Sequence, residues 1–250
     1  MPDQGRIHRF FTPDLPDTLP SRVHLPADEA HHARTVLRLA PGSAVELFDG
    51  RGTVGRGTLA SVARQGVTVD LDSKDSRPRP RPLVHVAFAA PKPKRLDWLL
   101  EKATELAAAS LGAVIFERSV AGARSLTDSK LRRWHARCLA AAKQSGLNVL
   151  PELRTTLTVG EYLAIERPPG DLRLLGDPAE DAAPLADAAA CPPAADNIHL
   201  LIGPEGGLGE RERAAALAAG FVPVRLGTTT LRIETAAVAI LAALVAICEP

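Results

Sequence analysis

Residues 198–210 read IHLLIGPEGGLGE. The apolar run Ile198 to Ile202 has the character of a buried strand, and it passes directly into seven residues that hold four glycines and one proline. Glycine has no Cβ, so such a loop brings bare backbone close to a ligand, whereas an ordinary turn needs fewer glycines. We therefore predict a strand, a ligand-binding loop and then a helix at residues 210–219.

The chemistry of this loop restricts the ligand that it binds. The Lys-Ser/Thr pair of a phosphate-binding P-loop is missing, and the carboxylate of Glu205 would repel a triphosphate. We therefore expect a ligand that is neutral or cationic near the loop.

The segment GRGTVG at residues 50–55 fits the dinucleotide-binding pattern, but it lies between two hairpin-like strands, where we interpret its glycines as turn residues.

A second loop joins a predicted strand at residues 222–226 to an apolar helix at residues 234–247. It reads GTTTLRI at residues 227–233, so Arg232 and Glu234 stand at the start of the helix. The helix dipole stabilises an acidic residue there by about 0.3–1 kcal/mol and disfavours a cation. The dipole therefore explains Glu234 and leaves Arg232 without a structural reason.

Strands and helices alternate along the second part of the chain. The apolar periods predict strands at residues 83–90, 113–116, 172–175, 198–202 and 222–226, and helices at residues 94–109, 128–144, 210–219 and 234–247. This alternation is typical of an α/β fold with a parallel sheet covered by helices on both faces.

The first part of the chain has a different pattern. Short strands are predicted at residues 44–48, 52–59 and 66–71, as in a small antiparallel barrel, after a short helix at residues 26–34. The alternating prolines of RPRPRP at residues 77–82 fit neither a helix nor a central strand, so we interpret this segment as an extended linker. We place the domain boundary there, with domains at residues 1–75 and 76–250.

The 30 Lys/Arg and 29 Asp/Glu residues nearly cancel, but they are unevenly distributed. Residues 76–150 hold 14 basic and 5 acidic side chains, a net charge of +9, whereas residues 1–75 carry −1 and residues 151–250 carry −7. A block this basic indicates a polyanionic partner, although the usual alternative for a Lys/Arg cluster is a solvated helix face.

The composition excludes several other classes of protein. With 46% hydrophobic and 24% charged residues the chain fits a globular protein, and its longest apolar run, residues 236–247, is too short to cross a membrane. The first residues, MPDQGRIHRF, contain no apolar stretch behind a basic start, so we expect no secretory signal. The dispersed Cys138, Cys191 and Cys248 favour reduced thiols in a cytoplasmic protein. The histidines lack metal-ligand spacing, so we expect no metal.

Several of these segments together resemble one known family. LIGPEGGL at residues 201–208, LG at 226–227 and LRIETA at 231–236 resemble the RsmE family, the 16S ribosomal RNA uridine-N3 methyltransferases of the SPOUT class. LFDG at 47–50, KATEL at 102–106, ERSV at 117–120 and KQSG at 143–146 agree with this resemblance. The similarity covers nearly the whole chain, and the two C-terminal motifs are specific in combination.

The resemblance implies an N-terminal PUA-like β-barrel, an α/β domain that threads a trefoil knot, and a homodimer. It also implies S-adenosylmethionine bound in the knot, and the acidic C-terminal segment agrees with a sulfonium cation. The implied cofactor-binding residues are Leu175, Leu201, Ile202, Gly203, Gly206, Gly207, Leu226, Gly227, Leu231, Arg232, Thr235 and Ala236. The residues expected to contact RNA are Arg34, Arg38, Lys92, Lys94, Arg95, Lys102, Lys143 and Gln144.

The implied reaction methylates N3 of a uridine in small-subunit ribosomal RNA. N3 lies on the Watson–Crick edge, so the base must be unpaired or flipped, and N3 must lose its proton. Arg232 would stabilise the developing uracil anion, and Glu234 or Glu205 would orient the base or accept the proton. The sequence leaves the choice between the two carboxylates open.

Two other functions remain compatible with the sequence. A SPOUT relative would methylate a ribose 2′-hydroxyl, and a non-catalytic assembly factor would bind ribosomal RNA without needing the cofactor. The sequence also departs from the family pattern twice: Leu147 stands where an arginine is common, and Thr228 to Thr230 replace Pro-Arg-Ile/Val. The first departure concerns an RNA contact, and the second concerns a basic residue at position 229.

Overall fold

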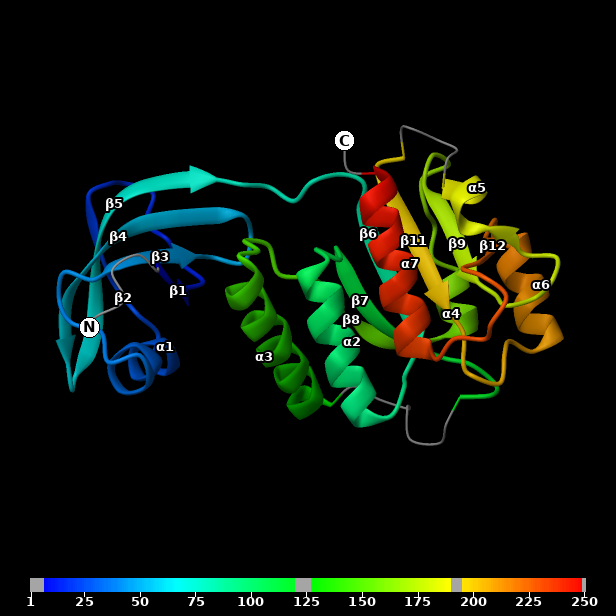
Figure 1. Cartoon of the computed structure of the whole chain (residues 1–250), viewed down its shortest axis with the longest axis horizontal. Helices are drawn as coiled ribbons and strands as arrows, with labels where there is room; N and C mark the ends of the chain where they lie inside the picture. Colours follow the sequence, from blue (N-terminus) through cyan, green and yellow to red (C-terminus); the bar gives the residue numbers. More distant parts are fainter. Residues whose placement is uncertain (1–6, 120–126, 190–194, 249–250) are drawn as a thin grey trace. The chain divides into compact units, whose positions relative to one another are not determined.

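The computed structural model describes residues 7–119, 127–189 and 195–248 (Figure 1). Val120 of the ERSV segment and Cys191 lie outside these residues. The chain divides into two compact units: unit 1 comprises Met1–Arg79 with Ala142–Leu150, and unit 2 comprises Pro80–Ala141 with Pro151–Pro250. A segment from the middle of the chain therefore groups with the N-terminal residues.

Unit 1 contains a five-stranded sheet in the order β1-β3-β4-β5-β2. Its strands are β1 (His8–Phe11), β2 (Ser21–His24), β3 (Ala44–Phe48), β4 (Thr53–Ala63) and β5 (Gly66–Ser76). β1 pairs parallel with β3, and the other neighbours pair antiparallel. The three strands predicted in this region are present, with β4 and β5 longer than expected.

The connections of unit 1 also follow the sequence. The predicted short helix is α1 (Ala27–His31), which continues into a π-helical turn, His32–Val36. The GRGTVG segment forms the turn into β4, where Asp49 Oδ1 accepts hydrogen bonds from the backbone N–H groups of Arg51 and Thr53 at 2.7 and 3.0 Å. Its glycines therefore serve a turn between strands, as predicted.

Unit 2 contains a seven-stranded sheet in the order β10-β12-β9-β11-β6-β7-β8, in which every neighbouring pair is parallel. The strands are β6 (Leu83–Ala89), β7 (Ser110–Ile115), β8 (Glu152–Thr158), β9 (Leu172–Gly176), β10 (Ala183–Pro184), β11 (Asn197–Ile202) and β12 (Val222–Arg225). The helices are α2 (Pro93–Glu105), α3 (Asp128–Ser145), α4 (Val159–Leu163), α5 (Leu185–Ala189), α6 (Glu210–Ala218) and α7 (Ile233–Cys248), and α3 belongs to unit 1 from Ala142 onward. The predicted parallel α/β architecture is confirmed.

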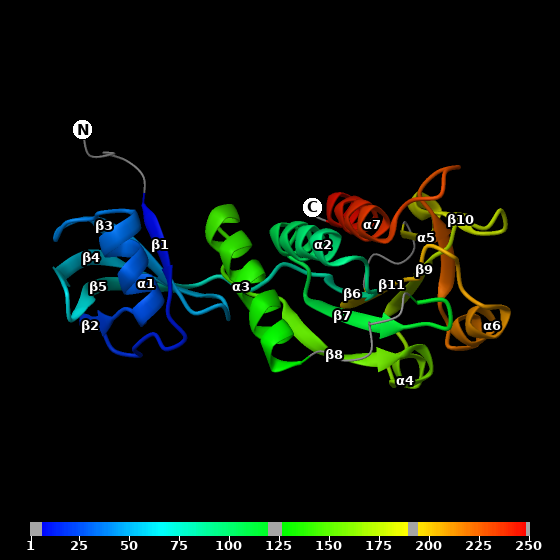
Figure 2. The ribbon, with the colours of Figure 1, turned by 90° about the horizontal axis from the view of Figure 1, so that it is seen from below.

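The helices of unit 2 lie on both faces of its sheet. Figure 2 shows α2 and α7 side by side on one face and α4 and α6 toward the other. α7 packs against β6, β9 and β11 through buried side chains that include Ile240, Leu241 and Leu244. None of the described helices is long and apolar enough to cross a membrane.

Four elements of unit 2 were not predicted from the sequence: β8, α4, β10 and α5. β8 reads ELRTTLT and lies at the edge of the sheet, so it carries polar side chains in place of an apolar run. α4, β10 and α5 span two to five residues, too few for a period to show.

Candidate functional site

A pocket lies at the carboxyl ends of β9, β11 and β12, the edge at which parallel α/β sheets bind ligands. It is bounded by the segments that follow these three strands and by the first turns of α7. The lining residues are Gly176, Asp177, Pro178, Ile202, Gly203, Pro204, Glu205, Gly207, Leu208, Val224, Arg225, Leu226, Gly227, Thr229, Thr230, Leu231, Ile233, Ala236 and Ile240.

The loop between β11 and α6 forms one wall of this pocket. A Cβ at Gly203 would lie 2.2 Å from Leu208 Cδ1, so the chain passes too close to Leu208 for any other residue without rearrangement. Gly207 has a φ of +72° and its N–H donates to the carbonyl of Pro204 at 2.9 Å. Arg118 holds the loop by donating to the carbonyl of Gly206 at 2.8 Å.

The loop between β12 and α7 forms the opposite wall. It turns at Gly227, whose φ of +136° is a conformation that L side chains rarely adopt. Arg232 immediately precedes α7, and its carbonyl accepts a hydrogen bond from the Ala236 N–H at 2.8 Å. The Arg232 side chain is exposed and has no hydrogen-bond or ion-pair partner among the described residues.

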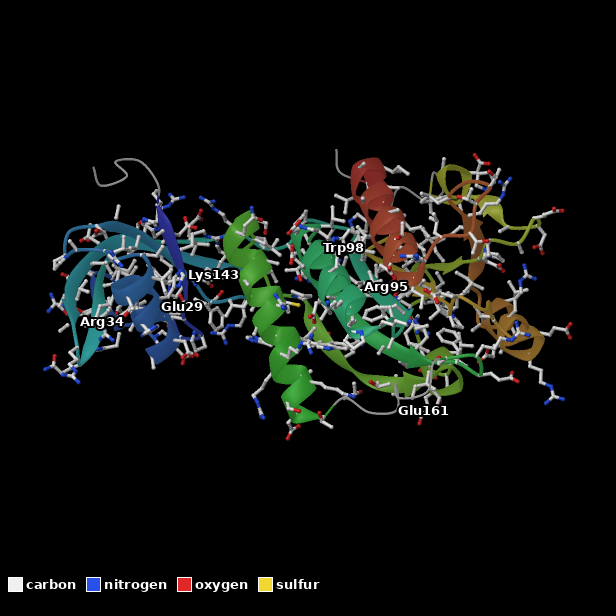
Figure 3. All side chains as sticks on the ribbon, turned by 60° about the horizontal axis from the view of Figure 1, so that its bottom comes forward. Glu29, Arg34, Arg95, Trp98, Lys143 and Glu161 are labelled. Atoms are coloured by element: carbon white, nitrogen blue, oxygen red, sulfur yellow. The ribbon has the colours of Figure 1, made fainter. Side chains whose placement is uncertain are left out.

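A guanidinium lies between the two carboxylates that the sequence left as alternatives. Arg95 of α2, which is labelled in Figure 3, places Nη1 3.0 Å from Glu205 Oε1 and Nε 3.4 Å from Glu234 Oε1. The Glu234 side chain is 9% exposed and the Glu205 side chain 52% exposed. Glu234 Oε2 is buried and has no hydrogen-bond partner within the described residues. Only Glu205 of these two carboxylates lines the pocket.

A third carboxylate, Asp177, follows β9 and lines the pocket, although sequence reasoning did not identify it. Arg213 of α6 donates from Nε to Asp177 Oδ2 at 2.7 Å and from Nη2 to Asp181 at 2.9 Å. The Ala179 N–H donates to Asp177 Oδ1 at 3.1 Å. No local motif marks this carboxylate, because its guanidinium partner comes from α6.

The structure brings together about half of the predicted cofactor residues. The residues that line the pocket are Ile202, Gly203, Gly207, Leu226, Gly227, Leu231 and Ala236. The residues outside the lining are Leu175 and Leu201, which are buried in β9 and β11, and Gly206, Arg232 and Thr235, which are exposed. Most of the residues that line the pocket but were not among the predicted cofactor residues are sequence neighbours of the predicted residues, in the same loops.

The predicted RNA-binding residues fall in two groups. Some are held by the protein itself. Arg34 donates to the carbonyls of Ala63 and Arg64, and Lys143 donates to both carboxylate oxygens of Glu29 at 2.9 and 2.7 Å (Figure 3 labels Arg34, Lys143 and Glu29). Lys102 donates to Glu105. Arg38, Lys92, Lys94 and Gln144 are exposed and have no side-chain partner among the described residues. Arg34, Arg38, Lys143 and Gln144 belong to unit 1, and Lys92, Lys94, Arg95 and Lys102 to unit 2.

A second polar cluster lies near the amino ends of the strands of unit 2. Asp171 accepts hydrogen bonds from His199 Nε2 at 2.9 Å and from Asn197 Nδ2 at 3.0 Å. The His199 ring stacks on His85, with the ring centroids 4.9 Å apart. Burial lowers the pKa of His199 to about 4, and burial also lowers the pKa of His85. In the described part of the chain, no group of three or more His, Cys, Asp or Glu side chains is arranged to hold a metal ion.

Two family models match the chain and define its class. A model of the RNA methyltransferase PUA domain matches residues 25–72, and a model of the RNA methyltransferase domain matches residues 78–245. The fold and these two models therefore define an RNA methyltransferase with an N-terminal PUA domain and a parallel α/β methyltransferase domain.

The relatives narrow this class to one family. The chain is 36% identical to the ribosomal RNA small subunit methyltransferase E of Mycobacterium bovis, over 94% of this chain and 89% of the relative. It is 31% identical to that of Synechocystis, over 91% and 74%. Its structure is similar to that of the Neisseria gonorrhoeae ribosomal RNA small subunit methyltransferase E bound to S-adenosyl methionine, with a TM-score of 0.86 and 29% identity over 96% of this chain and 97% of the other. The chain belongs to the ribosomal RNA small subunit methyltransferase E family, which confirms the resemblance seen in the sequence.

Proposed function

We propose that this chain transfers the methyl group of S-adenosylmethionine to N3 of a uridine in 16S ribosomal RNA. The observation that carries the proposal is the pocket at the ends of β9, β11 and β12, because one of its walls is the LIGPEGGL segment that resembles the family motif. The Neisseria gonorrhoeae relative bound to S-adenosyl methionine supports the choice of cofactor.

The residues of the pocket are chemically suited to this cofactor. Ile202, Leu226 and Ile240 offer apolar surface to an adenine ring, and the glycines offer bare backbone. Asp177 and Glu205 place carboxylates in the wall, which suits a sulfonium and an amino group. The lining contains no lysine, and S-adenosylmethionine has no phosphate that would need one. When bound, the cofactor supplies an electrophilic methyl group.

The side chains around the pocket would prepare the base for this transfer. Glu205 lines the pocket and is half exposed, so it is better placed than the buried Glu234 to accept the N3 proton. Arg232, at the start of α7, would stabilise the uracil anion. Because the reaction is an in-line displacement, positioning of the two reactants supplies most of the acceleration.

The proposal includes the assembly and the location of the protein. We assign the domains to residues 1–75 and 76–250, a division that the family models at residues 25–72 and 78–245 support, while Ala142–Leu150 groups with unit 1. A homodimer is supported by Trp98 on α2 and Ile247 on α7, which remain 43% and 45% exposed on neighbouring helices. Light scattering should return twice the chain mass of 26.4 kDa, and a monomer mass would contradict the dimer. A ribosomal RNA substrate implies the cytoplasm.

Mass spectrometry of nucleosides from 16S ribosomal RNA tests the reaction. RNA from a strain without this protein should lack one N3-methyluridine, and the purified chain should restore it with S-adenosylmethionine. Loss of a ribose methyl group instead would indicate a 2′-hydroxyl methyltransferase. Calorimetry that detects no S-adenosylmethionine binding would favour a non-catalytic assembly factor.

A further inference from the structure

Arg95 of α2 differs in its surroundings from the two basic residues that precede it, Lys92 at the N-cap and Lys94 in the first turn. Lys92 and Lys94 are exposed, whereas the Arg95 side chain is 31% exposed and contacts two carboxylates. We infer that Arg95 is a positioning residue that holds Glu205 for proton removal from the base, in place of the RNA-phosphate contact that the charge pattern suggested. This inference rests on the proposed function.

The two ion pairs of Arg95 connect a fixed carboxylate to a less fixed one. Glu234 belongs to the first turn of α7, which packs on α2, and its side chain is almost fully buried. The Glu205 side chain is 52% exposed, and among the described residues Arg95 is the partner that holds its carboxylate. The Arg95 guanidinium is a planar fork that engages both carboxylates through different nitrogens, so the buried anchor limits where Glu205 lies.

The local charge argues against a phosphate contact at Arg95. Arg95, Glu205 and Glu234 together carry a net charge of −1, with both carboxylates within 3.4 Å of the guanidinium. A phosphate that approached Arg95 would meet the two carboxylates that already contact the guanidinium, and these carboxylates would repel the phosphate. Lys92 and Lys94 have no such partners among the described residues, so phosphate contacts fall to them.

The ion pair leaves one oxygen of Glu205 available for chemistry. Glu205 Oε1 faces Arg95, and Oε2 has no hydrogen bond within the described residues. During transfer the N3–CH₃ bond forms, the S–CH₃ bond breaks with its electron pair on sulfur, and the N3 proton passes to Glu205 Oε2 and then to water. A misplacement of about 1 Å in such a group costs up to about 10²-fold in rate.

Kinetics of Arg95 variants separate positioning from RNA binding. Arg95→Ala should lower kcat by about 10- to 100-fold, leave the KM for RNA unchanged, and leave the slope of log RNA affinity against log salt unchanged. Arg95→Lys should recover part of kcat, because a single point charge replaces only part of the fork. If Arg95 acts through Glu205, adding Arg95→Ala to Glu205→Gln should lower kcat no further than Glu205→Gln alone.

Two controls keep the result interpretable. Arg133→Ala removes an exposed guanidinium that is paired with Asp97 of α2, and it should leave kcat unchanged. Because Arg95→Ala leaves Glu234 buried without its partner, the double variant Arg95→Ala/Glu234→Gln removes that charge if the single variant fails to fold.

The outcome that overturns the inference is a raised KM with normal kcat and a salt slope lowered by about 0.7–0.9, because this pattern belongs to a phosphate contact. Full additivity of Arg95→Ala with Glu205→Gln would also overturn it. A wild-type chain that produces no N3-methyluridine would contradict the proposed function instead, and the salt slope would still decide whether Arg95 contacts phosphate.

Discussion

Arg232 occupies a position that the helix dipole disfavours for a cation, directly before α7. If it stabilises the uracil anion, Arg232→Ala should lower kcat by roughly 10²–10³-fold, while calorimetry shows little change in S-adenosylmethionine affinity. The defect should shrink at higher pH, where more of the uracil is already deprotonated. Arg232→Lys should recover only part of the rate.

One outcome of the Arg232→Ala experiment would exclude a catalytic role for Arg232. If Arg232→Ala turns over normally at saturating RNA, Arg232 is a binding or structural residue, and catalysis must be assigned to Glu205 or Glu234. The exposed Arg232 side chain, which has no partner in the described part of the chain, makes this a direct comparison because no buried ion pair is broken.

His199 links the stability of unit 2 to pH. Its pKa is lowered by burial to about 4, below the unfolded value of about 6.5, so the unfolded chain binds a proton between these values and the folded chain does not. Stability should therefore be highest above pH 6.5 and fall as pH decreases toward 4, by an upper bound on the order of 3 kcal/mol. His85, whose pKa is also lowered, acts in the same direction.

Urea unfolding at pH 7 and pH 5 measures this effect through the shift in midpoint. His199→Gln keeps a donor for Asp171 and cannot titrate, so the difference between the two midpoints should be smaller than in the wild type. An equal difference in variant and wild type would exclude His199 as the group that titrates.

At the scale of elements, Gly203 tests whether the loop after β11 forms the cofactor site. Gly203→Val should abolish S-adenosylmethionine binding, because its Cβ would meet Leu208 Cδ1 at 2.2 Å and displace a side chain that lines the pocket. Gly170→Val is a matched control, since a Cβ there meets nothing within 4 Å. Calorimetry measures binding and circular dichroism checks folding; a folded Gly203→Val variant with normal affinity would remove this loop from the site.

The sequence predicts those helices, strands and loops whose composition and hydrophobic period are contained within one segment. The two loops with their glycines, the apolar helix α7 and the strands β6, β9 and β11 all follow from local composition and period. The edge strand β8 could not be predicted in this way, because an edge strand with polar side chains resembles a loop. The parallel pairing of β1 with β3 also depends on which distant strands meet.

At the scale of the whole molecule, the site contains contacts between residues that are far apart in the sequence, and no single segment predicts them. Arg95 lies 110 residues from Glu205 in the chain, and the charge pattern alone assigns it to RNA with its neighbours. Asp177 and Arg213 likewise meet from separate elements. The glycine walls of the pocket and both glutamates were therefore predictable from the sequence, whereas the guanidinium groups that fix the carboxylates were not, because they come from distant elements.

The net charge of +9 in residues 76–150 is partly paired within the protein, because Arg77, Arg81, Arg95 and Lys143 contact carboxylates outside this segment. The exposed basic residues that remain are those that we expect to contact RNA. Counterion release makes RNA affinity fall with salt, and each phosphate contact contributes about 0.7–0.9 to the slope of log affinity against log salt.

Lys94→Ala should lower the slope of log RNA affinity against log salt by this amount, because Lys94 is exposed and has no partner among the described residues. Lys102→Ala should change it less, since Lys102 is already paired with Glu101 and Glu105. Filter binding at salt concentrations from about 50 to about 300 mM, over which screening changes strongly, measures both slopes. Equal slopes for Lys94→Ala and the wild type would mean that the basic residues of α2 form a solvated helix face, and the RNA contacts would then have to lie elsewhere.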